Sequence, residues 1–206
     1  MTAAAPITVV VPTIPPRERL LRKALLSVKR QTLQPAEVIV ETDGEHTGSA
    51  ATRNRALARV STEWVAWLDD DDQFLPNHLE RLHDEAQRTG ADVVYSLPRV
   101  LDEHNNVKPR QWYWGGGPEF DPELLRRKAH IQTTSLVRTE FARKVGGFRF
   151  ITDETGAVND DHGFYLSLYD AGAKFAHVHE ETFIWRHHGY GLPGRSGNTS
   201  GQPSRW

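Results

Sequence analysis

Cysteine is absent from this 206-residue sequence, which excludes disulfide bonds and thiolate chemistry and fits a reducing compartment. Long apolar runs are absent too: no stretch of about 18 apolar residues predicts a membrane span, and the proline-rich N-terminus is unlike a signal peptide. An excess of charge of one sign is also missing, since 25 Lys and Arg residues oppose 27 Asp and Glu residues, a formal net charge of −2. No basic field therefore indicates nucleic acid or a membrane surface as a partner. Together these absences predict a soluble, cytoplasmic protein.

The composition that remains is that of an ordinary globular protein, with 38% hydrophobic and 25% charged residues. A chain of this length can bury one sizeable core but has little room for two. We therefore expect a single domain over residues 1–190. Residues 191–206 are rich in Gly, Ser and Pro, which predicts a flexible C-terminal tail.

The first half of the sequence alternates between strand and helix patterns. Ile7–Val11 is a β-branched run bounded by two prolines, typical of a strand buried on both faces of a parallel sheet. From Arg17 the apolar residues recur at helical spacing as far as the turn QTLQP. Further strands are predicted over 37–42, 63–68 and 91–97, and further helices over 49–60 and 77–90. The alternation predicts an α/β domain with a mostly parallel central sheet.

The second half carries weaker patterns. A strand is predicted over 131–137, helices over 139–145 and 160–171, and strands over 174–179 and 182–185. The two halves are joined by the loop QWYWGGGPEFDP, which combines three aromatic residues with three glycines. Such a loop can form a lid or a stacking platform for a sugar, or it can be an ordinary surface loop with aromatics folded inward.

An acidic run interrupts the apolar pattern in WVAWLDDDDQFLP, where Asp69–Asp72 follow the third predicted strand. Like charges about 4 Å apart repel by ~1 kcal/mol in water and by roughly 4 kcal/mol at an effective dielectric constant of about 20. The run therefore needs either full solvation or a cation. Its place between two apolar segments, at the strand end where α/β proteins bind ligands, favours a hard cation such as Mg²⁺ or Mn²⁺.

Several segments resemble one known family. They are VVVPTIPPRERLLRKALLSVKRQTLQPAEVIVETDG, SAATRNRALA, WVAWLDDDDQFLPNHLERL, TTSLVRTEFARKVGGF and NDDHGFYLSLYDAG, in this order. The set looks like family 2 glycosyltransferases of the GT-A fold. The resemblance implies one Rossmann-like GT-A domain, with a nucleotide-sugar-binding half over 1–98 and an acceptor and catalytic-base half over 99–190.

For the nucleotide, the resemblance implies contacts from three segments. Pro12 and Thr13 would approach the base and ribose, and Asp43 would accept a hydrogen bond from the base. Arg53, in TRN, would lie near the nucleotide or its diphosphate and could also pair with the acidic run. The alternatives are a turn residue at Asp43 and an exposed helix cation at Arg53.

For the metal, the resemblance points to the acidic run and to a late Arg-x-His element. Asp71 is the expected ligand of Mn²⁺ or Mg²⁺, while Asp69 or Asp70 would contact the ribose. Arg186 and His188 match the late element, so they are expected to contact the diphosphate or to complete the metal shell.

For the acceptor, the resemblance places a catalytic base at Asp161, in NDDHGFYLSL. Asp160 stands where the family has Glu, which leaves its role open. Acidic residues are also favoured at a helix N-terminus without any catalytic role. Trp112 and Trp114, in the aromatic loop, are candidates for contacting the acceptor.

The resemblance implies a metal-dependent inverting glycosyltransferase that uses a nucleotide sugar, with UDP as the first expectation. The acceptor is left open among a glycan, a metabolite, a protein and a modified nucleic acid. A non-catalytic nucleotide-sugar-binding module and a sugar-nucleotide hydrolase remain alternatives. A sugar-nucleotide pyrophosphorylase would normally have a glycine-rich loop after the first strand, where this sequence has PTIPPRER.

Overall fold

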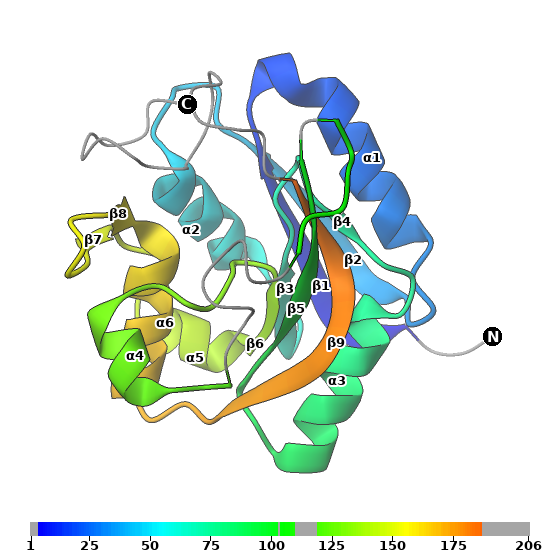
Figure 1. The fold of residues 1–206 in the computed structure, drawn as a ribbon. Helices are drawn as coiled ribbons and strands as arrows, with labels where there is room; N and C mark the ends of the chain where they lie inside the picture. Colours follow the sequence, from blue (N-terminus) through cyan, green and yellow to red (C-terminus); the bar gives the residue numbers. More distant parts are fainter. Residues whose placement is uncertain (1–3, 103, 110–118, 187–206) are drawn as a thin grey trace.

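A computed structural model describes residues 4–102, 104–109 and 119–186 (Figure 1). Its centre is a seven-stranded sheet with the strand order β2-β1-β3-β6-β5-β9-β4, next to a small hairpin of β7 and β8. The strands are β1 (Ala5–Thr13), β2 (Pro35–Thr42), β3 (Trp64–Trp67), β4 (Gln73–Phe74), β5 (Val93–Leu101), β6 (Ser135–Arg138), β7 (Ile151–Thr152), β8 (Val158–Asn159) and β9 (Phe175–Arg186). The helices are η1 (Pro15–Arg17), α1 (Glu18–Lys29), α2 (Ser49–Arg59), α3 (His78–Thr89), α4 (Pro122–Arg127), α5 (Thr139–Lys144) and α6 (Asp160–Asp170).

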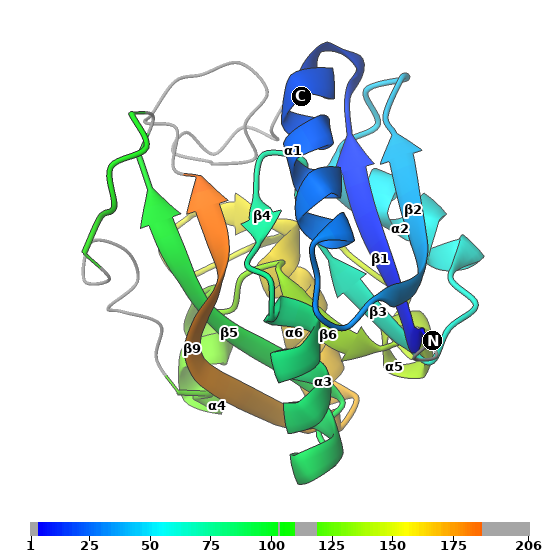
Figure 2. The ribbon, with the colours of Figure 1, turned by 90° about the vertical axis from the view of Figure 1, so that its right-hand side faces the viewer.

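The sheet is mixed but mostly parallel. β1 pairs in parallel with β2 and β3, and β5 pairs in parallel with β9. β6 lies between β3 and β5 and is antiparallel to both, so β5 points the same way as β1. Only β6 and the short β4 run against the other five strands (Figure 2). The predicted α/β class with a mostly parallel central sheet is therefore confirmed.

Helices cover both faces of this sheet. α1 and α3 lie on one face, and α2, α5 and α6 lie on the other (Figure 1). Alternate residues of β1 enter the two cores: Val9 and Val11 pack with the α1 and α3 side, whereas Val10 packs with the opposite side. This double burial explains why β1 is apolar at nearly every position rather than at every second one.

The elements of the first half agree with the sequence-based predictions to within a few residues. Their patterns are local, because each strand is a β-branched run and each helix has an apolar stripe with a clear end. Gly90 ends α3 in the left-handed region with φ of 66°, and its N–H donates to Ala86 O at 2.9 Å.

The second half departs from the predictions in several ways. The two strands predicted over 174–185 are one strand, β9, whose pairing with β5 shifts register near Ser96 and Leu97. The strand predicted to begin at residue 131 begins at Ser135. The short elements α4, β4, β7 and β8 were not predicted, since two to six residues carry no measurable periodicity. The tail 191–206 and most of the aromatic loop lie outside the described residues.

No helix in the described part of the chain is long and apolar enough to cross a bilayer.

Candidate functional site

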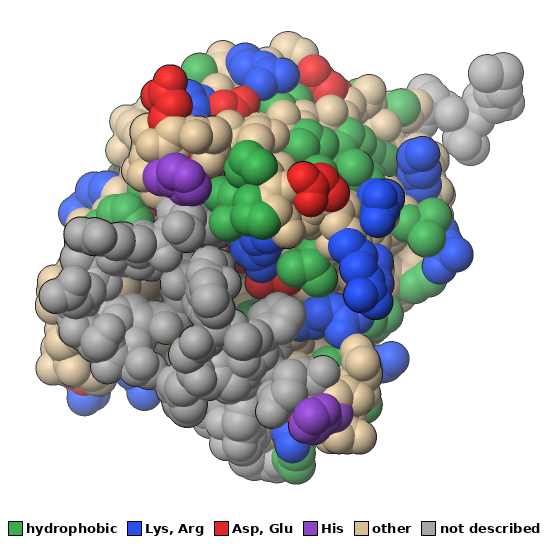
Figure 3. All heavy atoms as spheres, turned by 90° about the horizontal axis from the view of Figure 1, so that it is seen from above, with side chains coloured by type: hydrophobic (Ala, Val, Ile, Leu, Met, Phe, Trp, Pro, Cys, Tyr) green, Lys and Arg blue, Asp and Glu red, His purple; other side chains and the backbone are tan. Residues whose placement is uncertain are grey.

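The carboxyl ends of three neighbouring strands bring the predicted nucleotide segments together. Pro12 and Thr13 are the buried last residues of β1, and Asp43 N donates to Thr13 O at 2.8 Å just beyond β2. The acidic run follows β3, whose Leu68 N donates to Val10 O at 3.0 Å. Figure 3 shows this edge of the molecule from above, where acidic and basic side chains lie among apolar ones.

The four carboxylates of the acidic run are not equivalent. Asp70 and Asp72 are buried, whereas the side chains of Asp69 and Asp71 remain 27% and 20% exposed. A backbone hydrogen bond from Asp72 N to Asp69 O at 3.0 Å closes the run into a turn. The turn therefore sends alternate carboxylates inward and outward, which separates their charges.

Asp70 is held from two sides. Thr13 Oγ1 donates to Asp70 Oδ2 at 2.6 Å, and Arg17 Nη1 lies 3.1 Å from Asp70 Oδ1. The other terminal nitrogen of Arg17 donates to Asp71 Oδ2. Burial raises the pKa of Asp70 to about 7, against the lowering effects of Arg17 and Thr13. The predicted ribose contact of Asp70 therefore competes with contacts inside the protein.

Asp72 joins the acidic run to the end of β9. Its Oδ1 accepts a hydrogen bond from Arg186 N at 2.9 Å, and burial raises its pKa well above the ordinary value. The guanidinium of Arg186 donates to Gln73 Oε1 at 3.0 Å and to Asn105 Oδ1 at 2.6 Å. Asp72 and Arg186 thus hold this edge of the sheet together.

Arg53 links the two halves of the predicted site. Its buried guanidinium donates to Asp69 Oδ1 at 2.6 Å and to Asp160 Oδ2 at 2.7 Å, and lies 4.0 Å from Asp161 Oδ1. It also lies over the ring of Phe148, 5.1 Å from the centroid. Burial alone would lower the pKa of Arg53, but the carboxylates outweigh it and the pKa is raised. The guanidinium therefore pairs with the carboxylates, and Arg53 is not the exposed helix cation of the alternative interpretation.

Asp161 occupies the N-terminal turn of α6, where Asn159 caps the helix by accepting a hydrogen bond from His162 N at 2.7 Å. Its side chain is 26% exposed. Burial, followed by the charge of Asp160, raises the pKa of Asp161 to about 7. A carboxylate with this pKa can accept a proton near neutral pH and release it again.

Asp43 accepts hydrogen bonds from the turn that precedes α2. Its Oδ1 accepts from Thr47 N at 2.9 Å and from Thr47 Oγ1 at 2.8 Å, and its Oδ2 accepts from Gly48 N at 2.8 Å. Despite its burial, these donors lower the pKa of Asp43. The turn role that the Asp-Gly sequence left open is therefore present, and a nucleotide base would have to share this carboxylate.

Sequence reasoning did not anticipate three residues around the site. Arg17 had a usable signal, because it is the first cation after the opening strand. Thr133 contacts Asp161, and its hydrogen bond moderates the rise in the pKa of that residue. Tyr165, one turn after Asp161, donates from its hydroxyl to Gln132 O at 2.8 Å and so fixes α6 against the segment before β6. Neither residue carries a local pattern that indicates these partners.

The carboxylate oxygens of the acidic run fit a hard divalent cation that takes few ligands from the protein. The described residues contain no group of three His, Asp or Glu side chains arranged around one metal position. Asp69 and Asp71 nevertheless offer carboxylate oxygens near the surface, two residues apart. Mg²⁺ is commonly held by one or two carboxylates, with phosphate oxygens and water completing the shell. The predicted ligand His188 and the predicted acceptor contacts Trp112 and Trp114 lie outside the described residues.

Comparison with known proteins identifies the family. A family model described as glycosyl transferase family 2 matches residues 42–151, more than half of the chain, including α2, the acidic run and β6. The chain belongs to glycosyl transferase family 2. This confirms the family indicated by the sequence segments.

Two curated relatives of this family 2 protein cover parts of it. The uncharacterized glycosyltransferase YwdF of Bacillus subtilis is 30% identical over 112 residues, 43% of this chain and 41% of its own length. A GalNAc(5)-diNAcBac-PP-undecaprenol beta-1,3-glucosyltransferase of Campylobacter jejuni is 26% identical over 147 residues, 59% of this chain and 46% of its own. The chain thus spans less than half the length of these relatives.

Solved structures share the fold. TarS of S. aureus (residues 1–349) in complex with UDP-GlcNAc superposes with a TM-score of 0.68 and 17% identity, covering 94% of this chain and 62% of TarS. The same protein in complex with UDP gives a TM-score of 0.66 and 18% identity, covering 88% and 60%. The GT-A fold expected from the sequence is confirmed.

Proposed function

We propose that this chain is a nucleotide-sugar-dependent glycosyltransferase that moves a sugar to a hydroxyl acceptor, with inversion at the anomeric carbon. The observation that carries the proposal is the Arg53 guanidinium, which bridges Asp69 at the end of β3 and Asp160 beside Asp161. One ionic network thereby joins the carboxylates that would hold the cation and the leaving group to the carboxyl that would take the acceptor's proton. Membership of family 2 supports the same reaction class.

The donor is proposed to be a UDP-sugar. TarS, which has the same fold, has been solved with UDP and with UDP-GlcNAc. In this chain Pro12 and Thr13 at the end of β1, together with Asp43 after β2, would contact the base and ribose. Asp43 keeps its turn contacts and would share its carboxylate with a ring N–H of uracil.

Asp71, with Asp69 beside it, is proposed to hold Mn²⁺ or Mg²⁺ together with the diphosphate. When bound, such a cation would neutralise the charge that develops on the departing nucleoside diphosphate. Asp70 and Asp72 keep the loop in place through Thr13 and Arg186. Arg186 is a candidate for a diphosphate contact, and His188 is a candidate for completing the metal shell.

Asp161 is proposed to take the acceptor's proton. As the acceptor oxygen forms its bond to the anomeric carbon, the bond from that carbon to the diphosphate breaks, and the electron pair leaves with the diphosphate. Attack from the face opposite the leaving group inverts the configuration. Burial and the charge of Asp160 raise the pKa of Asp161 to about 7, which suits a general base worth about 10²- to 10⁴-fold in rate.

The acceptor side is proposed to include Trp112 and Trp114, which follow β5 in the sequence. Aromatic side chains can stack on the apolar face of a sugar ring. The class of acceptor stays open among glycans, metabolites, proteins and modified nucleic acids.

Calorimetry with UDP, GDP and dTDP, each with and without Mn²⁺, tests the donor site. We expect one nucleotide, UDP, to bind more tightly than the others and to bind more tightly when the metal is present. Equal affinity for all three regardless of metal would contradict the proposal. Release of free sugar from UDP-sugars at full rate without an acceptor would indicate a hydrolase instead.

A further inference from the structure

A cation of the chain itself already contacts the acidic run. Arg17 ends η1, four residues after the end of β1, and its side chain is only 13% exposed. Its Nη1 lies 3.1 Å from Asp70 Oδ1, and its Nη2 donates to Asp71 Oδ2. The guanidinium therefore neutralises part of the acidic run in this structure.

The two carboxylates that Arg17 contacts differ in what else can reach them. Asp70 is 2% exposed, and its second oxygen accepts a hydrogen bond from Thr13 at 2.6 Å. Asp71 is 20% exposed, so an ion from solvent can reach it. A Mg²⁺ ion binds a carboxylate oxygen at about 2.0 to 2.1 Å. At Asp71 such an ion would approach the same carboxylate as the guanidinium, and the two positive charges would repel each other.

The backbone of Arg17 is held by features that do not involve its guanidinium. Arg17 N donates to Ile14 O at 3.1 Å, and the two preceding residues, Pro15 and Pro16, have a restricted φ. The long Arg side chain can change rotamer without moving this turn. A change of partner for the guanidinium thus requires no rearrangement of β1 or α1.

We propose that Arg17 is a built-in counter-ion of the donor site, which competes with the divalent cation for Asp71 and transfers to the diphosphate when the nucleotide binds. This inference rests on the proposed donor site. A diphosphate supplies anionic oxygens for both cations, and a guanidinium binds phosphate oxygens in a bidentate manner. The cation alone should therefore bind weakly, and the cation and the nucleoside diphosphate should bind cooperatively.

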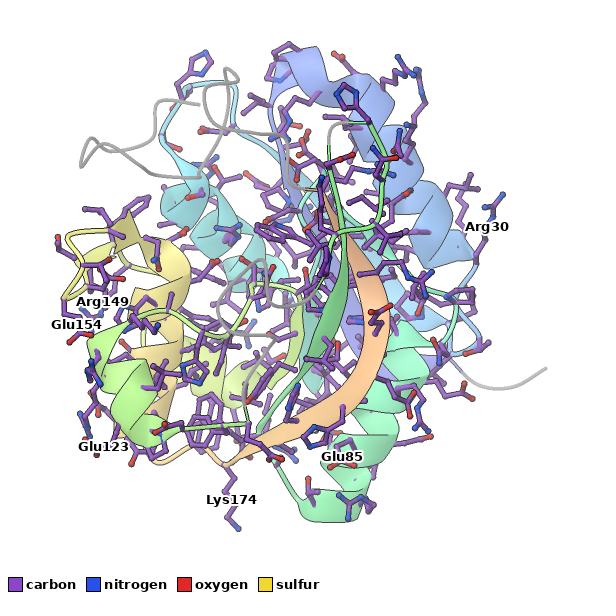
Figure 4. The ribbon with its side chains drawn as sticks, in the orientation of Figure 1. Arg30, Glu85, Glu123, Arg149, Glu154 and Lys174 are labelled. Atoms are coloured by element: carbon purple, nitrogen blue, oxygen red, sulfur yellow. The ribbon has the colours of Figure 1, made fainter. Side chains whose placement is uncertain are left out.

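Titration of Mn²⁺ followed by the electron paramagnetic resonance signal of the free ion tests this competition without any turnover. The variant is Arg17→Gln, and the matched control is Arg30→Gln. Arg30 lies at the far end of α1, about 20 Å along the helix from Arg17, and Figure 4 shows it pointing outward. Both substitutions remove one positive charge, so the control accounts for the change in net charge.

Without nucleotide, Arg17→Gln should bind Mn²⁺ about tenfold more tightly than the wild type, within the ~5- to 150-fold range of typical couplings between sites. Arg30→Gln should bind Mn²⁺ like the wild type. Saturating UDP should tighten Mn²⁺ binding strongly in the wild type and much less in Arg17→Gln. Arg17→Lys keeps the positive charge and should retain weak Mn²⁺ binding in the absence of UDP.

Mn²⁺ binding by Arg17→Gln that is no tighter than binding by Arg30→Gln would overturn the competition. Equally tight binding by Arg17→Gln and Arg17→Lys would also overturn it, because the charge would then not matter. In both cases wild-type binding of UDP with Mn²⁺ would leave the donor site standing. If neither the wild type nor any variant binds Mn²⁺, with or without UDP, GDP or dTDP, the proposed donor site itself fails.

Discussion

Removal of the Arg53 guanidinium should destabilise the fold strongly, because it leaves buried carboxylates without their cation. In Arg53→Ala, Asp160 would keep a side chain that is only 5% exposed, whereas the side chain of Asp69 is 27% exposed and can be hydrated. Breaking a buried ion pair by removing one partner typically costs about 3 to 5 kcal/mol. The loss should fall mainly on the contact with Asp160.

Proton uptake sets an independent upper limit on the stability that Arg53→Ala loses. A buried carboxylate without a partner can be neutralised, and pH 7 lies about three units above the ordinary pKa of Asp, which corresponds to about 4 kcal/mol at 1.36 kcal/mol per unit. At pH 5 the same step costs about 1.5 kcal/mol. The folded variant binds more protons than its unfolded state, so its deficit relative to the wild type shrinks as the pH falls. We expect a deficit of about 3 to 4 kcal/mol at pH 7 and about 1.5 kcal/mol at pH 5.

Urea denaturation of the wild type and the variant at both pH values measures this deficit. Arg59→Ala is the matched control: Arg59 lies on the same helix, is 59% exposed and pairs with Glu41 at 2.9 Å. An exposed pair of this kind is worth about 0 to 1 kcal/mol. The reasoning would be refuted if Arg53→Ala lost no more stability than Arg59→Ala at pH 7, or if its deficit were the same at pH 5.

Two further substitutions probe the base and the packing beneath Arg53. Asp161→Asn should still bind the nucleotide-sugar donor but transfer the sugar about 10²- to 10⁴-fold more slowly. The wild-type rate should rise with pH through about 7, because Asp161 loses its proton there. Normal turnover by the variant would exclude Asp161 as the base. Gly147→Ala should destabilise the fold by more than Gly146→Ala in urea denaturation. Both glycines have φ near +80°, so the backbone cost of about 1 to 3 kcal/mol for a non-glycine residue is common to the two variants. The difference between them is steric, because only at Gly147 would the new Cβ lie 2.1 Å from Asn54 Oδ1. Asn54 exchanges two hydrogen bonds with the backbone of Phe148, the ring beneath Arg53, so equal losses for the two variants would show that this contact contributes little.

Much of the first half of the fold was predictable from local patterns. The apolar runs of β1 and β3, the helical spacing in α1 and the left-handed Gly90 after α3 each depend on residues close together in the sequence. The order of the sheet was not predictable in this way. β6 enters between β3 and β5 through contacts between residues about 40 to 75 positions apart, and no local pattern encodes that pairing.

The candidate site, like the fold, was predictable from the sequence only in part. Residue types and spacing place the acidic run at the end of a strand and Asp161 in the first turn of a helix, because strand and helix ends have recognisable residues. They do not specify the partners of each carboxylate. Asp70 turns toward Thr13 and Arg17, Asp69 toward Arg53, and Asp72 toward the end of β9.

By itself, the sequence determined the family, the α/β class and the set of acidic residues available for chemistry. Only the tertiary structure decided that Arg53 joins Asp69 to Asp160, which lies 107 positions after Arg53 in the sequence, and that Arg17 already neutralises Asp71. The physical reason is that the effect of a charge depends on burial and on neighbours within a few ångströms. Those neighbours come from strands and helices that meet only when the chain folds.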